Sequence, residues 1–401
     1  MTAFFVLLAM AAYVAHTIRK LKKQLHTLQL NSYRTERYAR WLRQNYRKTL
    51  EYADAIPAVA LLSVLFGEIG FAALIWIAAY VALFLLRSPQ KEKKPLVFTG
   101  RAIRLLAAMI LLLLGACVPG AAALISSGSR AAAFFIFAGL MLLNLIPFAL
   151  VLVANALMTP FESVINRWYY NDARRKIRQM PRLNVIGITG SFGKTSTKTM
   201  LQRMLAEEFH VLMTPESYNT PMGVTKVIRS ALTPVHEMFV VEMGARQPGD
   251  IRELCELAAP KFGILTAIGE QHLETFHDIE TIIRTKHELI ESLPPDGAAF
   301  LNMDNKHIRA LADLTPVKKI FYGIDSDDLH YSARNLRVSG AGSVFEFCAP
   351  DGRQKTFQTR LLGKHNIYNI VAAAAVACEL GMDLAILAAV VKNLDPVTHR
   401  L

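Results

Sequence analysis

The sequence predicts an α-helical membrane region followed by a soluble α/β region. Its mean hydropathy over 401 residues is +0.28, which is high for a wholly soluble protein. Long apolar runs with almost no charge lie before about Leu157, whereas the rest of the chain has mixed charge and regular Gly and Pro residues. From Leu183 onward, strand-like and helix-like segments alternate, which is typical of a mostly parallel sheet covered by helices.

The net charge of +13 favours a membrane surface over nucleic acid as a partner. Much of the positive excess flanks the apolar runs, at Arg19–Lys23, Arg34–Lys48, Lys91–Lys94 and Ala173–Arg178. Positive charge beside hydrophobic spans is typical of cytoplasmic loops and of contact with anionic lipid. We therefore expect membrane lipid as a partner and no nucleic acid.

About five membrane spans are expected within residues 1–160, a multi-pass arrangement. The first is a short anchor over about Thr2–Thr17, without the cleavage-site pattern of a removed signal peptide. Ala55–Leu86 predicts a hairpin of two short helices interrupted at Phe66–Gly70, because a single long tilted helix would place one basic loop on the wrong side. Two more spans follow at about Leu105–Ile125 and Ala131–Leu157. Five crossings leave the amino terminus outside and the soluble region in the cytoplasm.

Two basic segments are expected at the membrane surface. Leu21, Leu25, Leu28, Tyr38, Trp41 and Leu42 recur at helical spacing between basic residues, which predicts an interfacial amphipathic helix. Contact with the lipid surface is the favoured role, and a site for a specific lipid substrate is the alternative. Residues 161–182 form a juxtamembrane basic linker, in which aromatic and basic residues together tether the soluble region to the bilayer.

Residues 183–395 are expected to form the α/β domain. Its strand candidates share short, β-branched or apolar runs ending near glycine or a polar residue: Leu183–Thr189, Val211–Thr214, Met238–Ala245, Phe262–Gly269 and Ala298–Asn302. Ligands bind beyond the carboxyl ends of strands in such sheets. The candidate functional residues follow these strand ends.

A P-loop-type sequence follows the first of these strands, in ITGSFGKTSTKT (Ile188–Thr199). Glycines allow the backbone to approach phosphate oxygens, a lysine supplies a positive charge, and a hydroxyl can ligate magnesium. The strict P-loop spacing is not met, because Ile188 stands at the first glycine position. A chance Gly-Lys-Thr loop is the alternative, but a strand before and a helix after it favour phosphate binding. The predicted cofactor-binding residues of this loop are Gly190, Ser191, Gly193, Lys194, Thr195 and Ser196.

Three further residues carry weaker signals. Glu242 ends a strand after four apolar residues, where a carboxylate is costly to bury unless it meets a cation. His272 lies in a loop after the next strand and could ligate a metal through its neutral imidazole. Lys286 lies on a predicted helix and, taken alone, would be an ordinary solvated lysine. Only the order of the three along the chain indicates a site.

That order resembles the central ATPase domain of the Mur ligases, which make the peptide stem of the bacterial cell wall. The resemblance rests on TGSFGKTSTK, VVEMGARQPGDI, ILTAIGEQHLETF, RTKHELI, FLNMDN and LLGKHNIYNIVAAAAVACELG, and runs from about Asn184 to the end of the chain. SYNTPMGVTK and EMGARQPGDI are most similar to the members that add D-alanyl-D-alanine to a muramoyl-tripeptide.

The resemblance implies roles for individual residues. Those near the nucleotide are Lys194 at the ATP phosphates, together with Asn302, His365, Asn366, Asn369 and Arg400. Those implied at magnesium are Thr195 and Glu242 for one ion, and His272 and a carbamylated Lys286 for a second. Lys194, His272 and Lys286 are the implied catalytic residues, and Asn219 and Thr220 are implied to meet the amino-sugar peptide substrate.

The implied activity is ATP-dependent amide formation in the synthesis of a peptidoglycan precursor. The γ-phosphoryl group activates a substrate carboxylate as an acyl phosphate, which an amine then attacks. The implied cofactors are ATP and Mg²⁺, and the implied partners are a muramoyl-peptide substrate, a D-amino-acid dipeptide and other wall-synthesis enzymes at the bacterial cell membrane. The alternatives are an idle ATP-binding scaffold, a ligase for a lipid-linked substrate, a transporter and a folate polyglutamate ligase. No second Walker segment supports the transporter, and the membrane region and SYNTPMGV weigh against the folate enzyme.

Two departures from the family pattern bear on this expectation. The membrane region stands where the family has a soluble domain that grips the uridine nucleotide, so the substrate could be nucleotide-linked or lipid-linked. The family also has a third domain that binds the incoming amine. Arg400 resembles the arginine that opens that domain, so residues 396–401 are expected to be its start, in a chain that is a fragment.

Overall fold

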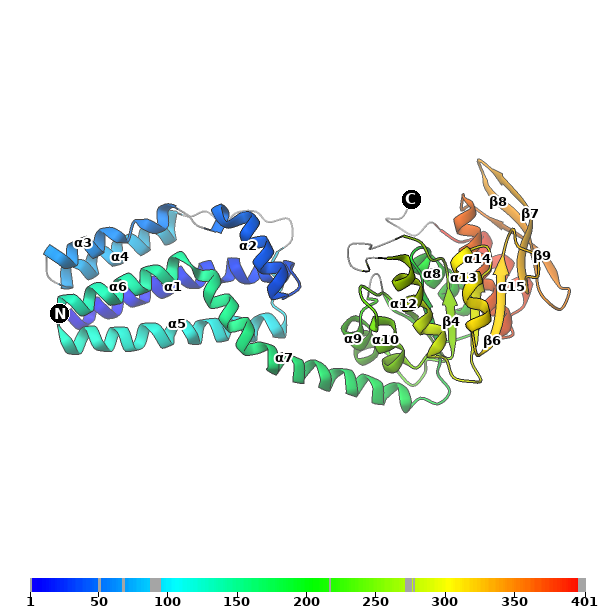
Figure 1. Ribbon diagram of the computed structural model, residues 1–401, viewed down its shortest axis with the longest axis horizontal. Helices are drawn as coiled ribbons and strands as arrows, with labels where there is room; N and C mark the ends of the chain where they lie inside the picture. Colours follow the sequence, from blue (N-terminus) through cyan, green and yellow to red (C-terminus); the bar gives the residue numbers. More distant parts are fainter. Residues whose placement is uncertain are drawn as a thin grey trace. The chain divides into compact units, whose positions relative to one another are not determined.

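The computed structural model describes residues 2–49, 52–66, 69–86, 95–215, 218–270, 276 and 278–395. The chain divides into two compact units, Met1–Ile165 and Asn166–Leu401 (Figure 1). The first unit is helical, and the second is an α/β unit built on one sheet. The order of a helical region before an α/β region agrees with the predicted fold class, and the membrane location of the helical unit stays a prediction.

The first unit packs its helices around an aromatic core. Tyr13, Trp76, Tyr80 and Phe137 are fully buried, and the rings of Trp76 and Phe137 stack with centroids 4.5 Å apart. Its helices are α1 (Thr2–Leu30), α2 (Thr35–Thr49), the 3₁₀ turn η1 (Tyr52–Ala55), α3 (Ala58–Phe66), α4 (Ile69–Leu86), α5 (Gly100–Ser127), α6 (Arg130–Leu145) and the start of α7 (Pro147–Arg178).

Three helices of the described residues, α1, α5 and α7, are long and apolar enough to cross a membrane by length and composition. Helices α4 and α6 and the segment Ala53–Leu65 are apolar but shorter. The two helices expected within Ala55–Leu86 are present as α3 and α4, which pack against each other. The number of crossings stays a prediction.

The span expected over Ala131–Leu157 is not one helix. Helix α6 ends at Leu145, and α7 begins at Pro147. Proline has no backbone N–H and its ring clashes with the preceding turn, so a proline within an apolar run favours a break. The span over Leu105–Ile125, in contrast, lies within the continuous helix α5.

The amphipathic segment expected at the membrane interface is also different. Helix α1 does not stop near Thr17 but continues to Leu30, so its apolar residues Leu21, Leu25 and Leu28 are fully buried in the core of the unit. A turn with positive φ at Ser32 and Tyr33 then separates α1 from α2. The prediction of one interfacial helix over these residues is therefore wrong, because the apolar stripe packs on the other helices.

Within the described residues of the second unit, nine strands form one sheet in the order β2-β3-β1-β4-β5-β6-β7-β8-β9. Neighbouring strands from β2 to β7 pair in parallel, whereas β7, β8 and β9 pair antiparallel. The strands are β1 (Asn184–Thr189), β2 (Val211–Met213), β3 (Met238–Glu242), β4 (Phe262–Leu265), β5 (Ala298–Asn302), β6 (Lys318–Gly323), β7 (Tyr331–Ser339), β8 (Gly342–Cys348) and β9 (Gln354–Thr359). The five expected strands are confirmed as β1 to β5.

Helices cover both faces of this sheet. Because side chains alternate along a strand, Ile186 and Ile188 of β1 pack with α8, α14 and α15, whereas Val185 packs with α9, α10, α12 and α13. The helices are α8 (Lys194–Leu205), α9 (Pro221–Ala231), α10 (Asp250–Ala258), α12 (Ile279–Glu291), α13 (Lys306–Leu311), α14 (Lys364–Glu379) and α15 (Leu384–Lys392). Strands β3 and β2 lie on one side of β1, and β4 lies on the other side. The order in which strands are added to the sheet therefore reverses at β1.

The end of α7, from Asn166 onward, belongs to the second unit and packs on its helices α9 and α10. The Tyr170 hydroxyl donates to the carbonyl of Glu253 at 2.9 Å, and the Lys176 ammonium donates to the carbonyl of Ile228 at 3.0 Å. The Arg229 guanidinium lies over the rings of Trp168 and Tyr169. The aromatic residues of the expected juxtamembrane linker therefore contact α9 and α10.

Candidate functional site

The loop between β1 and α8 is shaped by two glycines with positive φ. Gly190 has φ 154° and Gly193 has φ 81°. A Cβ atom on Gly190 would lie 2.1 Å from the Thr266 hydroxyl, and one on Gly193 would lie 2.5 Å from Oδ1 of Asn369. The amide of Ser191 donates to the carbonyl of Ala267 at 2.6 Å. The loop is thus pressed against the segment after β4 and against α14, and only glycine fits at both positions.

Helix α8 begins at Lys194 directly after this loop. Its first amides have no partner within the helix and carry the positive end of the helix dipole, which suits an anion. The Lys194 ammonium donates to the carbonyls of Gly190, at 2.7 Å, and Ser191, at 3.4 Å, so it lies across the loop. Ser196 lies in the first turn of α8 and is half-buried. This arrangement fits a polyphosphate.

Glu242 lies at the end of β3, beside β1 and next to α8. It is only 1% exposed, and its carboxylate accepts hydrogen bonds from the Thr195 hydroxyl at 2.9 Å, the Lys198 ammonium at 3.0 Å and the Asn219 amide at 3.2 Å. The structure therefore brings together Thr195, Glu242 and Asn219, which the sequence places in one site. The hydroxyl and carboxylate oxygens fit a magnesium ion, which prefers hard oxygen ligands.

Lys198 is a site residue that sequence reasoning missed. Its side chain is 1% exposed and forms a buried ion pair with Glu242. Thr195 and Lys198 are three residues apart on α8, so they lie on the same face of the helix. The sequence did contain a signal for Lys198. The Glu242 carboxylate needs a cation if it is buried, and Lys198 follows Thr195 at a spacing that places both on one face of the predicted helix.

Lys286 lies on α12 and is not a solvated lysine. It is 5% exposed. Burial, and after it the positive charge of Lys194, lowers the pKa of Lys286 to about 7, against the opposing effect of Asp250 and Glu288. The Glu288 carboxylate accepts from the amides of Gly249 and Arg252 at the start of α10. The charge of Lys194 thus acts on Lys286, so the two lysines are electrostatically coupled.

Asn302 and Asn369 adjoin the glycine loop from two other elements. Asn302 ends β5, and its amide donates to the carbonyl of Thr266 at 2.8 Å. Oδ1 of Asn369, on α14, accepts from the Thr197 hydroxyl at 3.1 Å. Asn366 donates to the carbonyl of Leu362 within its own turn, and His365 is exposed. Asn369 is thus at the loop, Asn302 is at the segment after β4 that packs against the loop, and the other two lie at the start of α14.

The remaining predicted residues have different outcomes. Thr220 caps α9 by accepting from the amide of Gly223, next to Asn219. His272 and Arg400 lie outside the described residues. No group of three or more His, Cys, Asp or Glu side chains suited to a metal ion occurs among the residues that the structure describes. The second magnesium site stays a prediction.

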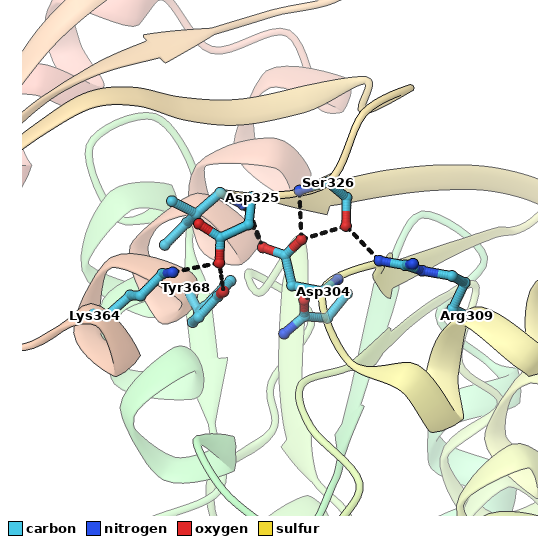
Figure 2. A network of polar contacts seen from close by, with 8 residues as sticks. Asp304, Arg309, Asp325, Ser326, Lys364 and Tyr368 are labelled. Atoms are coloured by element: carbon cyan, nitrogen blue, oxygen red, sulfur yellow. Dashed lines mark hydrogen bonds and ion pairs between the residues drawn. The ribbon is translucent and has the colours of Figure 1, made fainter.

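A polar network joins the start of α14 to the loops after β5 and β6 (Figure 2). The Asp304 carboxylate accepts from the amides of Ile324 at 2.6 Å, Asp325 at 2.9 Å and Ser326 at 2.7 Å. The Asp325 carboxylate in turn accepts from Lys364 and from the Tyr368 hydroxyl on α14. Sequence reasoning did not assign these residues, although Asp304 stands within the quoted motif FLNMDN.

The network lines a pocket of about 560 Å³ and fixes the helix that carries His365, Asn366 and Asn369. Burial alone would raise the pKa of Asp304, but hydrogen bonds from Ser326 and from the amides of Asp325 and Ile324 outweigh burial and hold the pKa below its usual value. Asp304 therefore stabilises the fold as an anion. That stabilisation is present above its unfolded pKa and is lost as the pH falls through the lower folded value.

Replacing Asp304 with asparagine is expected to lower the free energy of unfolding by about 2 kcal/mol, because charge-assisted bonds to the backbone amides are weakened. Asp327→Asn changes an exposed carboxylate that lines the same pocket and is the matched control. Urea unfolding at pH 7 measures both. Equal stability of the two variants would contradict this role of Asp304.

The second unit is similar to known proteins over most of its length. Residues 188–377 match the model of the Mur ligase middle domain. A UDP-N-acetylmuramoyl-tripeptide–D-alanyl-D-alanine ligase from Mycobacterium tuberculosis (strain H37Rv) is 34% identical over 220 residues, covering 55% of this chain and 43% of the relative. The ligase of the same name from Escherichia coli K12 is 30% identical over 236 residues, covering 59% of this chain and 52% of the relative. The chain spans about half the length of the curated relatives it matches.

Solved structures show the same similarity. MurF from Acinetobacter baumannii matches with a TM-score of 0.54 at 26% identity, covering 59% of this chain and 51% of that one. MurF from Thermotoga maritima, solved in complex with ADP, matches with a TM-score of 0.53 at 28% identity, covering 58% and 53%.

Proposed function

We propose, from the premise that residues 188–377 form a Mur ligase middle domain, that this chain is a membrane-anchored ATP-dependent amide ligase. Its reaction would add D-alanyl-D-alanine to a muramoyl-tripeptide precursor of the cell wall, as the names of its curated relatives state for those proteins. The observation that carries the proposal is the meeting of Thr195, Glu242 and Asn219 beside the glycine loop.

ATP would supply the phosphoryl group that makes a substrate carboxylate reactive as an acyl phosphate, and magnesium would neutralise charge during that transfer. The protein's own residues provide the binding geometry. The amides at the start of α8 and the Lys194 ammonium would hold the phosphates, and Thr195 and Glu242 would provide oxygen ligands for the ion. Asn219, in the segment before α9, donates a hydrogen bond to the Glu242 carboxylate. A substrate would meet the nucleotide at this position.

The direct test supplies the purified chain, in lipid nanodiscs, with Mg-ATP, UDP-muramoyl-tripeptide and D-alanyl-D-alanine. We expect ADP release that depends on both substrates, and a pentapeptide product detected by mass spectrometry. A lipid-linked muramoyl-tripeptide as the acceptor in a parallel reaction distinguishes the two substrate types. Nucleotide binding without product from either acceptor would favour an idle scaffold, and absence of nucleotide binding would overturn the site.

We further propose that Lys286 is carbamylated. Only a neutral amine attacks CO₂, and the Lys286 pKa of about 7 makes this amine largely neutral in a pH range where ordinary lysines are charged. Its Nζ would form a bond to the carbon of CO₂ and release one proton to water, leaving a carbamate. The product is an anion that can ligate a metal.

The test traps carbamates by alkylation in bicarbonate buffer and locates them by mass spectrometry. Trapping at Lys286 is expected to rise as the pH increases through about 7, while exposed Lys355 stays unmodified. The lowered pKa also means that Lys286 reduces stability below pH 7, a cost that decreases as the pH rises from about 7 to 10.5. Equal trapping at the two lysines would contradict the proposal.

The membrane region is proposed to hold the ligase unit at the cytoplasmic face of the cell membrane. The apolar lengths of α1, α5 and α7 support this placement. Protease added to spheroplasts should leave the second unit intact, whereas protease added to inverted membrane vesicles should digest it. Digestion from the outside would overturn the orientation, and recovery of the chain in the soluble fraction would overturn the anchoring.

A further inference from the structure

A buried ion pair joins α8 to the end of β3 in the second unit. The Lys198 ammonium lies 3.0 Å from Oε2 of Glu242, and the two side chains are 1% and 2% exposed. Removing two charges from water costs a desolvation energy that their attraction often only offsets, so an intact buried pair adds little net stability to a fold. A role for the charge of Lys198 is therefore a better explanation of this pair than stability.

The Glu242 carboxylate is shared among several donors. Its Oε2 accepts from the Thr195 hydroxyl at 2.9 Å as well as from Lys198, and its Oε1 accepts from the Asn219 amide at 3.2 Å. Thr195 and Glu242 are the groups proposed above to hold magnesium. A divalent ion bound by them would share the carboxylate with the Lys198 ammonium. The two cations would repel each other strongly, because the site is shielded from solvent water.

The charges at the start of α8 favour an anion over a free metal ion. Lys194 and Lys198 are cations and Glu242 is an anion, so these three side chains together carry a net positive charge. The first amides of α8 add the positive end of a helix dipole. A divalent cation by itself gains little from this group, whereas a bound polyphosphate makes the local charge negative.

We propose that Lys198 makes the site bind nucleotide first and the metal ion only with it, an inference that rests on the proposed ATP and magnesium site. Without nucleotide, the Lys198 ammonium neutralises the Glu242 carboxylate, holds it beside Thr195 and repels a free divalent ion. With nucleotide, the phosphates supply the negative charge that attracts the ion to Thr195 and Glu242. Lys198 is thus a positioning residue that acts through Glu242.

The first measurement is the affinity for Mn²⁺, a spectroscopic substitute for Mg²⁺, by electron paramagnetic resonance on the full chain in zwitterionic lipid nanodiscs. Lys198→Met removes the charge at similar length, and Lys198→Gln removes the charge but keeps a hydrogen-bond donor. Without nucleotide, both variants should bind Mn²⁺ about tenfold more tightly, because a cation beside the carboxylate is lost. Arg203→Met removes an exposed cation from the same helix and should leave the affinity unchanged.

The second measurement is the affinity for ADP in EDTA, by calorimetry on the same variants. Both Lys198 variants should bind metal-free ADP at least about threefold more weakly, because the lost cation also attracts the phosphates. The two affinities thus move in opposite directions, whereas a general loosening of the site would weaken both.

An Mn²⁺ affinity that is unchanged or lower in both Lys198 variants would overturn the inference, and so would an equal rise in Arg203→Met. These results are distinct from a failure of the proposed function. In that case the wild-type chain would bind no ADP, with or without Mn²⁺, and the inference would fail together with the nucleotide site.

Discussion

Replacing Lys194 with methionine is expected to lower the rate of amide formation by at least about 100-fold, while the protein remains folded. An ammonium group in the cradle offsets negative charge that increases during phosphoryl transfer, and the loss of one such donor commonly has this magnitude. Lys194 is half-buried, and methionine, which has a similar length, can occupy the same space beside the carbonyls of Gly190 and Ser191. ADP formation and nucleotide affinity by calorimetry measure the effect.

Lys355→Met, which removes an exposed lysine on β9, is the matched control and should keep full activity. A second result is expected from Lys194→Met. Burial is the main cause of the lowered pKa of Lys286, and the charge of Lys194 is the next. Lys194→Met should therefore raise the pH at which Lys286 becomes reactive towards CO₂. Unchanged activity in Lys194→Met would refute the proposed phosphate site.

Replacing Glu242 with glutamine is expected to lower the free energy of unfolding by about 3 kcal/mol and magnesium-dependent ADP formation by at least about 100-fold. The stability loss arises because the buried ammonium of Lys198 loses its ion pair with the Glu242 carboxylate. The activity loss arises because the carboxylate ligand for magnesium is lost. Thermal unfolding and ADP formation are measured on the same preparations.

A double variant separates the two effects. Glu242→Gln with Lys198→Met removes the buried ammonium together with its carboxylate partner, so stability should recover in part while activity stays low. Glu208→Gln, at an exposed position just after α8, is the control for loss of one carboxylate. Recovery of activity together with stability would show that Glu242 acts through folding alone, and not as a magnesium ligand.

Much of the second unit was predictable because its strands are short apolar runs with polar residues at their ends. The sequence therefore located β1 to β5, the glycine loop and Glu242. Strands β6 to β9 were not predicted. β6 begins with two lysines, and β7 to β9 form an antiparallel, half-exposed part of the sheet, with alternating polar residues such as those of Gln354–Thr359. The partner of Glu242 was also missed, since only packing shows that Lys198 turns inward.

In the first unit, apolar composition located the helices but not what they face. Leu21, Leu25 and Leu28 have the same spacing whether an apolar stripe meets lipid or other helices, and the structure places them in the core. Proline at position 147 was visible in the sequence, but whether it bends or breaks a helix depends on what satisfies the freed carbonyls. Here the Lys20 ammonium bonds the carbonyl of Asn144.

The sequence by itself determined the division into apolar helices and an α/β region, and the residues of the phosphate-type loop, because hydropathy and local spacing follow directly from residue order. Only the tertiary structure decided which charges meet. The partners are distant along the chain in three cases: Glu242 with Lys198, Asp304 with the amides after β6, and Asp54 with Lys20. The energies of these pairs depend on burial and on the distance between the charges, which no local sequence pattern encodes.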